Sequence, residues 1–134
     1  MPQDPELTHR MRRALEAHAG ISEKRMMGGT CFFLNGNMLS GARRDKDGLR
    51  RFMFRVGKER EAEALARPEA RPLIQGTRKL GGLVIVAGED CTEDKLRDLL
   101  SLCLSHAAAL PPKSLKDIAF PVSLIFPNTL SRFS

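Results

Sequence analysis

The chain has 134 residues, 42% of them apolar and 28% charged, which is typical of one soluble globular domain that is large enough to form a core. Its 22 basic and 16 acidic residues give a formal net charge of +6, which is compatible with a polyanionic partner. No apolar run approaches the roughly 18 residues of a membrane-spanning helix, and the N-terminus lacks the apolar core of a secretion signal, so the sequence predicts a cytoplasmic protein without membrane contact.

A helix is predicted over residues 5–18. Asp4 is a favourable N-cap, Pro5 suits the first helical position, and Gly20 suits the position after the end of a helix. Apolar side chains recur at helical spacing on one face, and arginines cluster on the other. The simplest interpretation is a helix that packs its apolar face on the core and leaves its arginines in water.

Three antiparallel strands are predicted next, over residues 24–34, 37–43 and 49–56. Asn35-Gly36-Asn37 forms the first turn, because Asn-Gly tolerates the positive φ angles that tight hairpins need. Asp45-Lys46-Asp47-Gly48 forms the second turn. The three strands and two turns make up one continuous hairpin-built unit.

The alternation of side chains predicts how this sheet is buried. Phe52 and Phe54 point to one face of the third strand, whereas Arg51 and Arg55 point to the other. This pattern is typical of a sheet with one face on the core and one face near water. In the first strand, the successive apolar residues 31–34 predict that both faces are covered at that place, or that one face meets another chain.

The following segments predict a short helix over residues 58–67, strands near 71–75 and 83–86, and a final helix that begins after Asp90 or Thr92 and ends near residue 108. The predicted fold class is therefore α+β in the order α-β-β-β-α-β-β-α. The five predicted strands belong to a sheet in which the first three are antiparallel neighbours.

The chain divides into a domain over residues 1–113 and a C-terminal tail over residues 114–134. The tail contains an apolar, β-prone run from Phe120 to Phe126, flanked by prolines. An exposed run of this kind is prone to association. We therefore expect the tail to dock on the domain or to contact a partner.

Residues that commonly catalyse reactions or bind metals are sparse. Cys31, Cys91 and Cys103 lie far apart, and no spacing of cysteine and histidine matches a zinc site or a disulfide framework. The glycine pairs match no phosphate-binding motif. The sequence therefore predicts a protein that is not an enzyme and has no catalytic residue, cofactor or metal ligand. A small enzyme that uses a cysteine is the minor alternative.

Basic residues concentrate between residues 43 and 60, where there are eight basic and three acidic residues. Together with basic residues of other strands they predict a surface that binds a polyanion or a partner, and a solvated outer face is the alternative. No Trp or Tyr accompanies them, which disfavours a platform for base stacking. The predicted surface comprises Lys24, Arg25, Arg43, Arg44, Arg51, Arg55, Arg78 and Lys79.

Several short motifs also follow one another in an ordered series. They are Lys24-Arg25-Met26-Met27-Gly28-Gly29, Asn35-Gly36-Asn37 with Gly41 after it, Phe52-Met53-Phe54-Arg55-Val56-Gly57, Ala70-Arg71-Pro72, Gly81-Gly82-Leu83-Val84 and Leu110-Pro111-Pro112-Lys113. This series resembles the N-terminal domain family of the bacterial competence regulator TfoX (Sxy) over about residues 4–113. The chain departs from the family pattern at Leu83, where Trp is usual, and at Met27, where Phe is usual. It is also too short for the second, C-terminal domain of full-length TfoX.

The resemblance implies a two-layer α+β fold similar to that of secretion-chaperone-like proteins, with an antiparallel sheet of about five strands and helices on one face. It implies no catalytic residues and no cofactor. It implies a regulatory or adaptor domain that acts by protein–protein contact in transcription regulation. Homodimerisation is one way for such a domain to cover its apolar surface. Weak, sequence-independent nucleic-acid binding through the basic surface of residues 43–60 is the alternative function.

Overall fold

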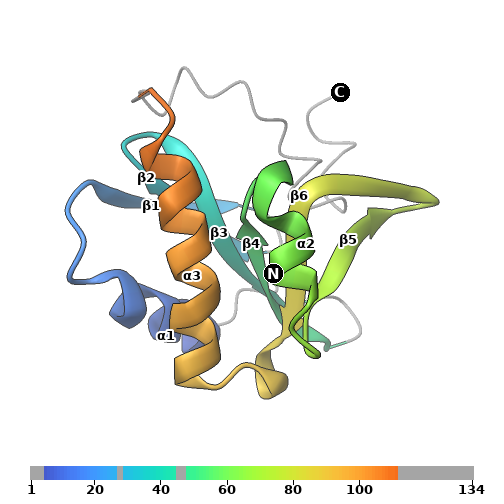
Figure 1. Ribbon diagram of the computed structural model, residues 1–134. Coiled ribbons are helices and arrows are strands. Elements are labelled where there is room, and N and C mark those ends of the chain that lie inside the picture. The colour runs from blue at the N-terminus through green and yellow to red at the C-terminus, as the bar shows by residue number, and fades with distance from the viewer. Residues whose placement is uncertain (1–4, 27–28, 45–47, 112–134) are drawn as a thin grey trace.

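The computed structural model describes residues 5–26, 29–44 and 48–111 (Figure 1). The helices are α1 (Pro5–Leu15), α2 (Glu61–Leu65) and α3 (Glu93–Ala108), with short 3-10 helices η1 (Lys58–Arg60) and η2 (Gly88–Asp90). The strands are β1 (Ile21–Met26), β2 (Gly29–Leu34), β3 (Asn37–Arg44), β4 (Arg50–Arg55), β5 (Arg71–Gln75) and β6 (Arg78–Ala87). The predicted α+β class is confirmed.

The described strands form one antiparallel sheet of six strands in the order β1-β2-β3-β4-β6-β5. The single strand predicted over residues 24–34 is in fact two strands, because the chain reverses between Met26 and Gly29, which are cross-strand partners. A two-residue connection between antiparallel strands favours glycine, and the sequence has Gly28 there, outside the described residues. The expected number of about five strands is therefore corrected to six for the described part of the chain.

The first predicted turn is present. Asn35 has a φ of 50° and Gly36 a φ of 82°, the left-handed conformation that the Asn-Gly pair tolerates. Of the second predicted turn, Gly48 has a φ of 86°, and residues 45–47 lie outside the described residues. The predicted tail over residues 114–134 also lies outside them.

The start of α3 settles the two alternative caps. The hydroxyl of Thr92 accepts a hydrogen bond from the backbone N–H of Lys95 at 3.3 Å, so Thr92 and not Asp90 is the N-cap. Glu93 and Asp94 follow in the first turn, where carboxylates stabilise the positive end of the helix dipole.

The three α-helices of the described residues pack on one face of the sheet, as predicted (Figure 1). Phe52 and Phe54 of β4 are 0% exposed in the core beneath them, and their ring centroids lie 6.1 Å apart. The helices contribute aliphatic and sulfur-containing side chains to the same core: Leu7, Met11 and Leu15 from α1, Ala64 from α2, and Leu96, Leu99, Leu100, Cys103 and Ala107 from α3. We call this side of the sheet the helix face.

The opposite side, which we call the second face, is buried as well, and this corrects the expectation that it lies near water. Met53 lies between Arg51 and Arg55 on β4 and is 5% exposed, and Phe33 on β2 is 1% exposed. Apolar residues from several strands meet on this face, and the alternation within β4 alone does not reveal them. The expectation that both faces are covered along residues 31–34 is confirmed, because each of these residues is at most 8% exposed.

Gly57, which lies between β4 and η1, occupies a place without room for a side chain. Its φ is 85°, and a Cβ atom there would overlap the imidazole of His106 on α3. We expect Gly57→Ala to lower the free energy of unfolding by more than the roughly 1–2 kcal/mol of a left-handed non-glycine residue. Gly48→Ala is the matched control, because Gly48 has a φ of 86° and no atom within 4 Å of the added Cβ. Urea denaturation of both variants measures the difference, and equal losses would refute the steric argument.

Candidate binding surfaces on the two faces of the sheet

Strand register explains why the second face is apolar. Cys31, Gly41, Met53 and Ile85 are successive cross-strand partners on β2, β3, β4 and β6. Cross-strand partners share a face, so these residues form one row across the sheet. The buried cluster on this face consists of Cys31, Phe33, Met38, Met53, Leu73, Leu80 and Leu83, with Met26 and Ile85 packed against it.

The charges on the second face have one sign in the described strands. Lys24 is the cross-strand partner of Cys31, Arg43 and Arg51 are partners of each other, and Arg55 is the partner of Leu83. The described strands contain one acidic residue, Glu23, whose partner is Phe32 of the helix-face core. The second face therefore combines an apolar centre with basic residues and, in the strands described, no carboxylate.

Two of these arginines are withdrawn from water. Arg43 is 6% exposed. Arg55 is partly buried, its Nη1 donates to the carbonyl oxygen of Met38 at 3.4 Å, and burial lowers the pKa of its guanidinium. Charges at partly desolvated positions interact more strongly with a partner than charges in open water. The second face therefore holds part of its positive charge at partly desolvated positions.

The eight residues of the predicted basic surface lie on both faces of the sheet. Lys24, Arg43, Arg51 and Arg55 are on the second face, and so is Arg78, two positions before Leu80 of the second-face cluster. The remaining three, Arg25, Arg44 and Lys79, are on the helix face. The structure thus places five of the eight predicted residues on one surface and the other three on the opposite side of the sheet.

Each helix-face member has a distinct environment. Arg25 is the cross-strand partner of Thr30, and Arg44 is the partner of Arg50, whose guanidinium pairs with Glu6 of α1. Lys79 lies 2.8 Å from a carboxylate oxygen of Glu61 on α2. The same carboxylate accepts a hydrogen bond from the backbone N–H of Gly82, and these bonds lower the pKa of Glu61. The ion pair of Lys79 and Glu61 therefore links α2 to the β5–β6 hairpin.

The glycines and asparagines of the family-like motifs have structural positions. Asn35 and Gly36 form a turn, Gly41 lies in the second-face row, and Gly29 begins β2. Gly81 and Gly82 lie in β6 where its pairing with β5 is interrupted, and the backbone of Gly82 closely approaches that of Gly57 and Lys58. Asn37 is 2% exposed, and its side chain donates to the carbonyl oxygen of Pro111 at 2.8 Å.

The three cysteines are free thiols and are buried. Burial raises the pKa of Cys91 to about 11, and it raises the pKa values of Cys31 and Cys103 as well. A raised pKa keeps a thiol protonated and unreactive at neutral pH. Nothing in the geometry of the three thiols therefore favours nucleophilic chemistry.

This burial predicts a simple labelling result. We expect the folded protein to react negligibly with a thiol reagent such as 5,5′-dithiobis(2-nitrobenzoic acid) at pH 7, and the denatured protein to release about one equivalent of chromophore per cysteine. Absorbance at neutral pH with and without denaturant measures both. A cysteine that reacts in the folded protein as fast as free cysteine would support the cysteine-enzyme alternative.

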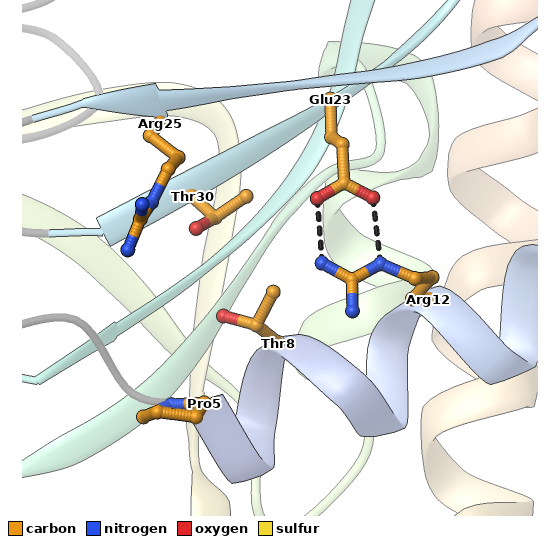
Figure 2. A pocket seen from close by; sticks show the side chains of 6 residues that line it. All are labelled: Pro5, Thr8, Arg12, Glu23, Arg25 and Thr30. Atoms are coloured by element: carbon orange, nitrogen blue, oxygen red, sulfur yellow. Dashed lines mark hydrogen bonds and ion pairs between the residues drawn. The ribbon is translucent and has the colours of Figure 1, made fainter.

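A hollow of about 290 Å³ lies on the helix face between α1 and the β1–β2 hairpin (Figure 2). Its lining residues are Pro5, Thr8, Arg12, Glu23, Arg25 and Thr30. Nε and Nη2 of Arg12 donate to the two carboxylate oxygens of Glu23, each at 2.7 Å, which lowers the pKa of Glu23. No sequence motif predicts this hollow, because its residues come together only through strand register and helix packing.

Comparison with protein-family models, with curated proteins and with solved structures finds no match for this chain. The resemblance to the TfoX N-terminal domain family is therefore a prediction from the sequence motifs. None of the described helices is both long and apolar enough to cross a membrane. Within the described ranges, histidine, cysteine, aspartate and glutamate form no group of three that could hold a metal ion.

Proposed function

We propose that this protein is a non-enzymatic regulatory or adaptor domain that binds a protein partner through the second face of its sheet, in transcription regulation as the TfoX-like motifs imply. The observation that carries the proposal is the composition of that face. Its apolar cluster suits a hydrophobic contact, and its basic residues, without a carboxylate in the described strands, suit a partner that supplies acidic groups.

The proposal includes contact of a partner segment with this face. The cluster residues are at most 6% exposed, although the described helices all pack on the helix face. A partner segment with apolar and acidic side chains suits the cluster and its basic neighbours, and a second copy of this chain is one such partner in a homodimer.

Weak nucleic-acid binding is the second candidate, and the same basic residues support it. Lys24, Arg43, Arg51, Arg55 and Arg78 on one face make an electrostatic surface that attracts phosphates without reading sequence. The apolar cluster between them has no role in such binding. The protein-partner proposal accounts for both the basic residues and the apolar cluster of this face, so we favour it.

The experiment that separates the two candidates is affinity capture from a bacterial lysate by the full chain, with and without nuclease. Under the adaptor proposal, the same protein is retained after nuclease treatment and its retention depends on second-face residues. Under the nucleic-acid candidate, captured material disappears with nuclease, and affinity falls steeply with salt.

A further inference from the structure

The hollow between α1 and the β1–β2 hairpin contains a buried hydroxyl without a partner. Thr8 is 7% exposed, and its Oγ1 is closed to solvent and makes no hydrogen bond. Buried polar groups in native proteins nearly always have a partner, so an orphan hydroxyl calls for a bound group that the described chain does not supply. In Figure 2 this hydroxyl points into the hollow, toward the side where Arg25 and Thr30 lie.

Strand register places a cation beside this hydroxyl. Arg25 and Thr30 are cross-strand partners on β1 and β2, so their side chains stand next to each other above the first turns of α1. Figure 2 shows the guanidinium of Arg25 on the side of the hollow toward which the hydroxyls of Thr8 and Thr30 point. Arg25 is exposed, so its guanidinium is accessible to a ligand that arrives from solvent.

The guanidinium of Arg12 also borders the hollow, and it already forms an ion pair with Glu23. Nε and Nη2 of Arg12 hold the carboxylate of Glu23, and Nη1 points away from that carboxylate (Figure 2). The Arg12–Glu23 pair is neutral, so Arg25 gives the hollow a net charge of one positive unit. The guanidinium groups only donate hydrogen bonds and the threonine hydroxyls both donate and accept them, so this set with its net positive charge suits an anion.

We propose that this hollow binds a phosphate group. Guanidinium groups are well matched to phosphate oxygens, and a hydroxyl donor completes the set of contacts. In the bound state, a phosphate oxygen accepts the hydrogen bond of Thr8 Oγ1, and Arg25 covers the anion from the solvent side. The volume of about 290 Å³ leaves room for the group that carries the phosphate. The site lies on the helix face and is independent of the partner surface on the second face.

The test is a titration of the ¹⁵N-labelled full chain with inorganic phosphate and, separately, with O-phosphoserine, followed by amide chemical shifts. We expect saturable shifts centred on residues 8, 25 and 30. Thr8→Val and Arg25→Gln should each weaken binding about tenfold, as expected for a lost hydrogen bond to a charged group. Arg97→Gln, which removes an exposed arginine of α3 that does not line the hollow, is the matched control and should leave the affinity unchanged.

The stability of Thr8→Val shows whether weaker phosphate binding reflects a lost contact with the ligand or a destabilised fold. Valine removes an unpaired buried hydroxyl and keeps its shape, so we expect an unchanged or higher Tm together with weaker phosphate binding. Tighter binding of O-phosphoserine than of inorganic phosphate would identify a phosphorylated side chain as the ligand, and equal binding would identify the free ion; both results support the site. The absence of saturable shifts with both probes, or binding that Thr8→Val and Arg25→Gln leave intact, would overturn the proposal.

Discussion

Replacing Phe54 by alanine is expected to lower the free energy of unfolding by about 3–5 kcal/mol, the range for a buried phenylalanine in a well-packed core. Phe54 is 0% exposed in the helix-face core, where its neighbours on the sheet are Ser40 of β3 and Val84 of β6. The substitution removes the ring and leaves a cavity between the sheet and the helices. Since small domains have about 5–15 kcal/mol of stability in total, this loss is a large fraction of it.

Urea denaturation followed by circular dichroism measures the loss. Ile74→Ala is the control, because Ile74 is also an apolar strand residue but is 54% exposed, and its truncation should cost less than about 1 kcal/mol. A loss at Phe54 as small as the loss at Ile74 would mean that the helices do not pack on the sheet as described.

Local patterns in the sequence were sufficient for the features that depend on near neighbours. The alternation around Phe52 and Phe54 correctly identified the helix-face side of β4, and Asn35-Gly36 correctly identified a turn. The cap of α3 was narrowed to two residues, of which Thr92 is the one used. Each of these features is determined by residues within a few positions of one another.

Features that depend on distant segments were missed. Met53 is buried in a cluster with Cys31, Phe33 and Leu83 of other strands, and the spacing within β4 does not show which strands lie beside it. The hollow around Thr8 likewise requires α1 to pack against β1 and β2. Strand order and register determine which of these distant segments lie side by side. The packing of the whole domain in turn determines strand order and register.

The separation of the predicted basic surface is a different case, because the signal was present in the sequence. Three pairs of that surface are consecutive residues: Lys24 and Arg25, Arg43 and Arg44, and Arg78 and Lys79. Consecutive residues in a strand point to opposite faces, so the members of each pair cannot share one surface. Applying this rule before summing the charges separates the second face from the helix face.

Arg51→Glu is expected to weaken partner binding about tenfold or more without unfolding the protein. Arg51 lies directly opposite Arg43 on the second face, so the new carboxylate faces a buried guanidinium. Opposite charges at such positions stabilise a strand pair by about 0.2–1 kcal/mol. The substitution also removes a positive charge from the binding face and adds a negative one, which should weaken capture of an acidic partner about tenfold or more.

Arg44→Glu is the matched control for this charge reversal. Arg44 and Arg50 are opposite each other on the same two strands, one position further along, and they lie on the helix face. The control therefore changes the net charge by the same amount and also creates a cross-strand pair of glutamate and arginine. Binding that depends on total charge alone responds equally to the two variants, whereas binding to the second face responds to Arg51→Glu.

The most direct test of the second face as a protein-binding surface is quantitative capture of the retained protein by the wild type and these two variants, after nuclease treatment. The account predicts that the wild type and Arg44→Glu retain the same protein in similar amounts, and that Arg51→Glu retains much less of it although its urea denaturation curve shows a folded domain. Equal retention by all three proteins, or the loss of all captured material after nuclease treatment, would contradict the account.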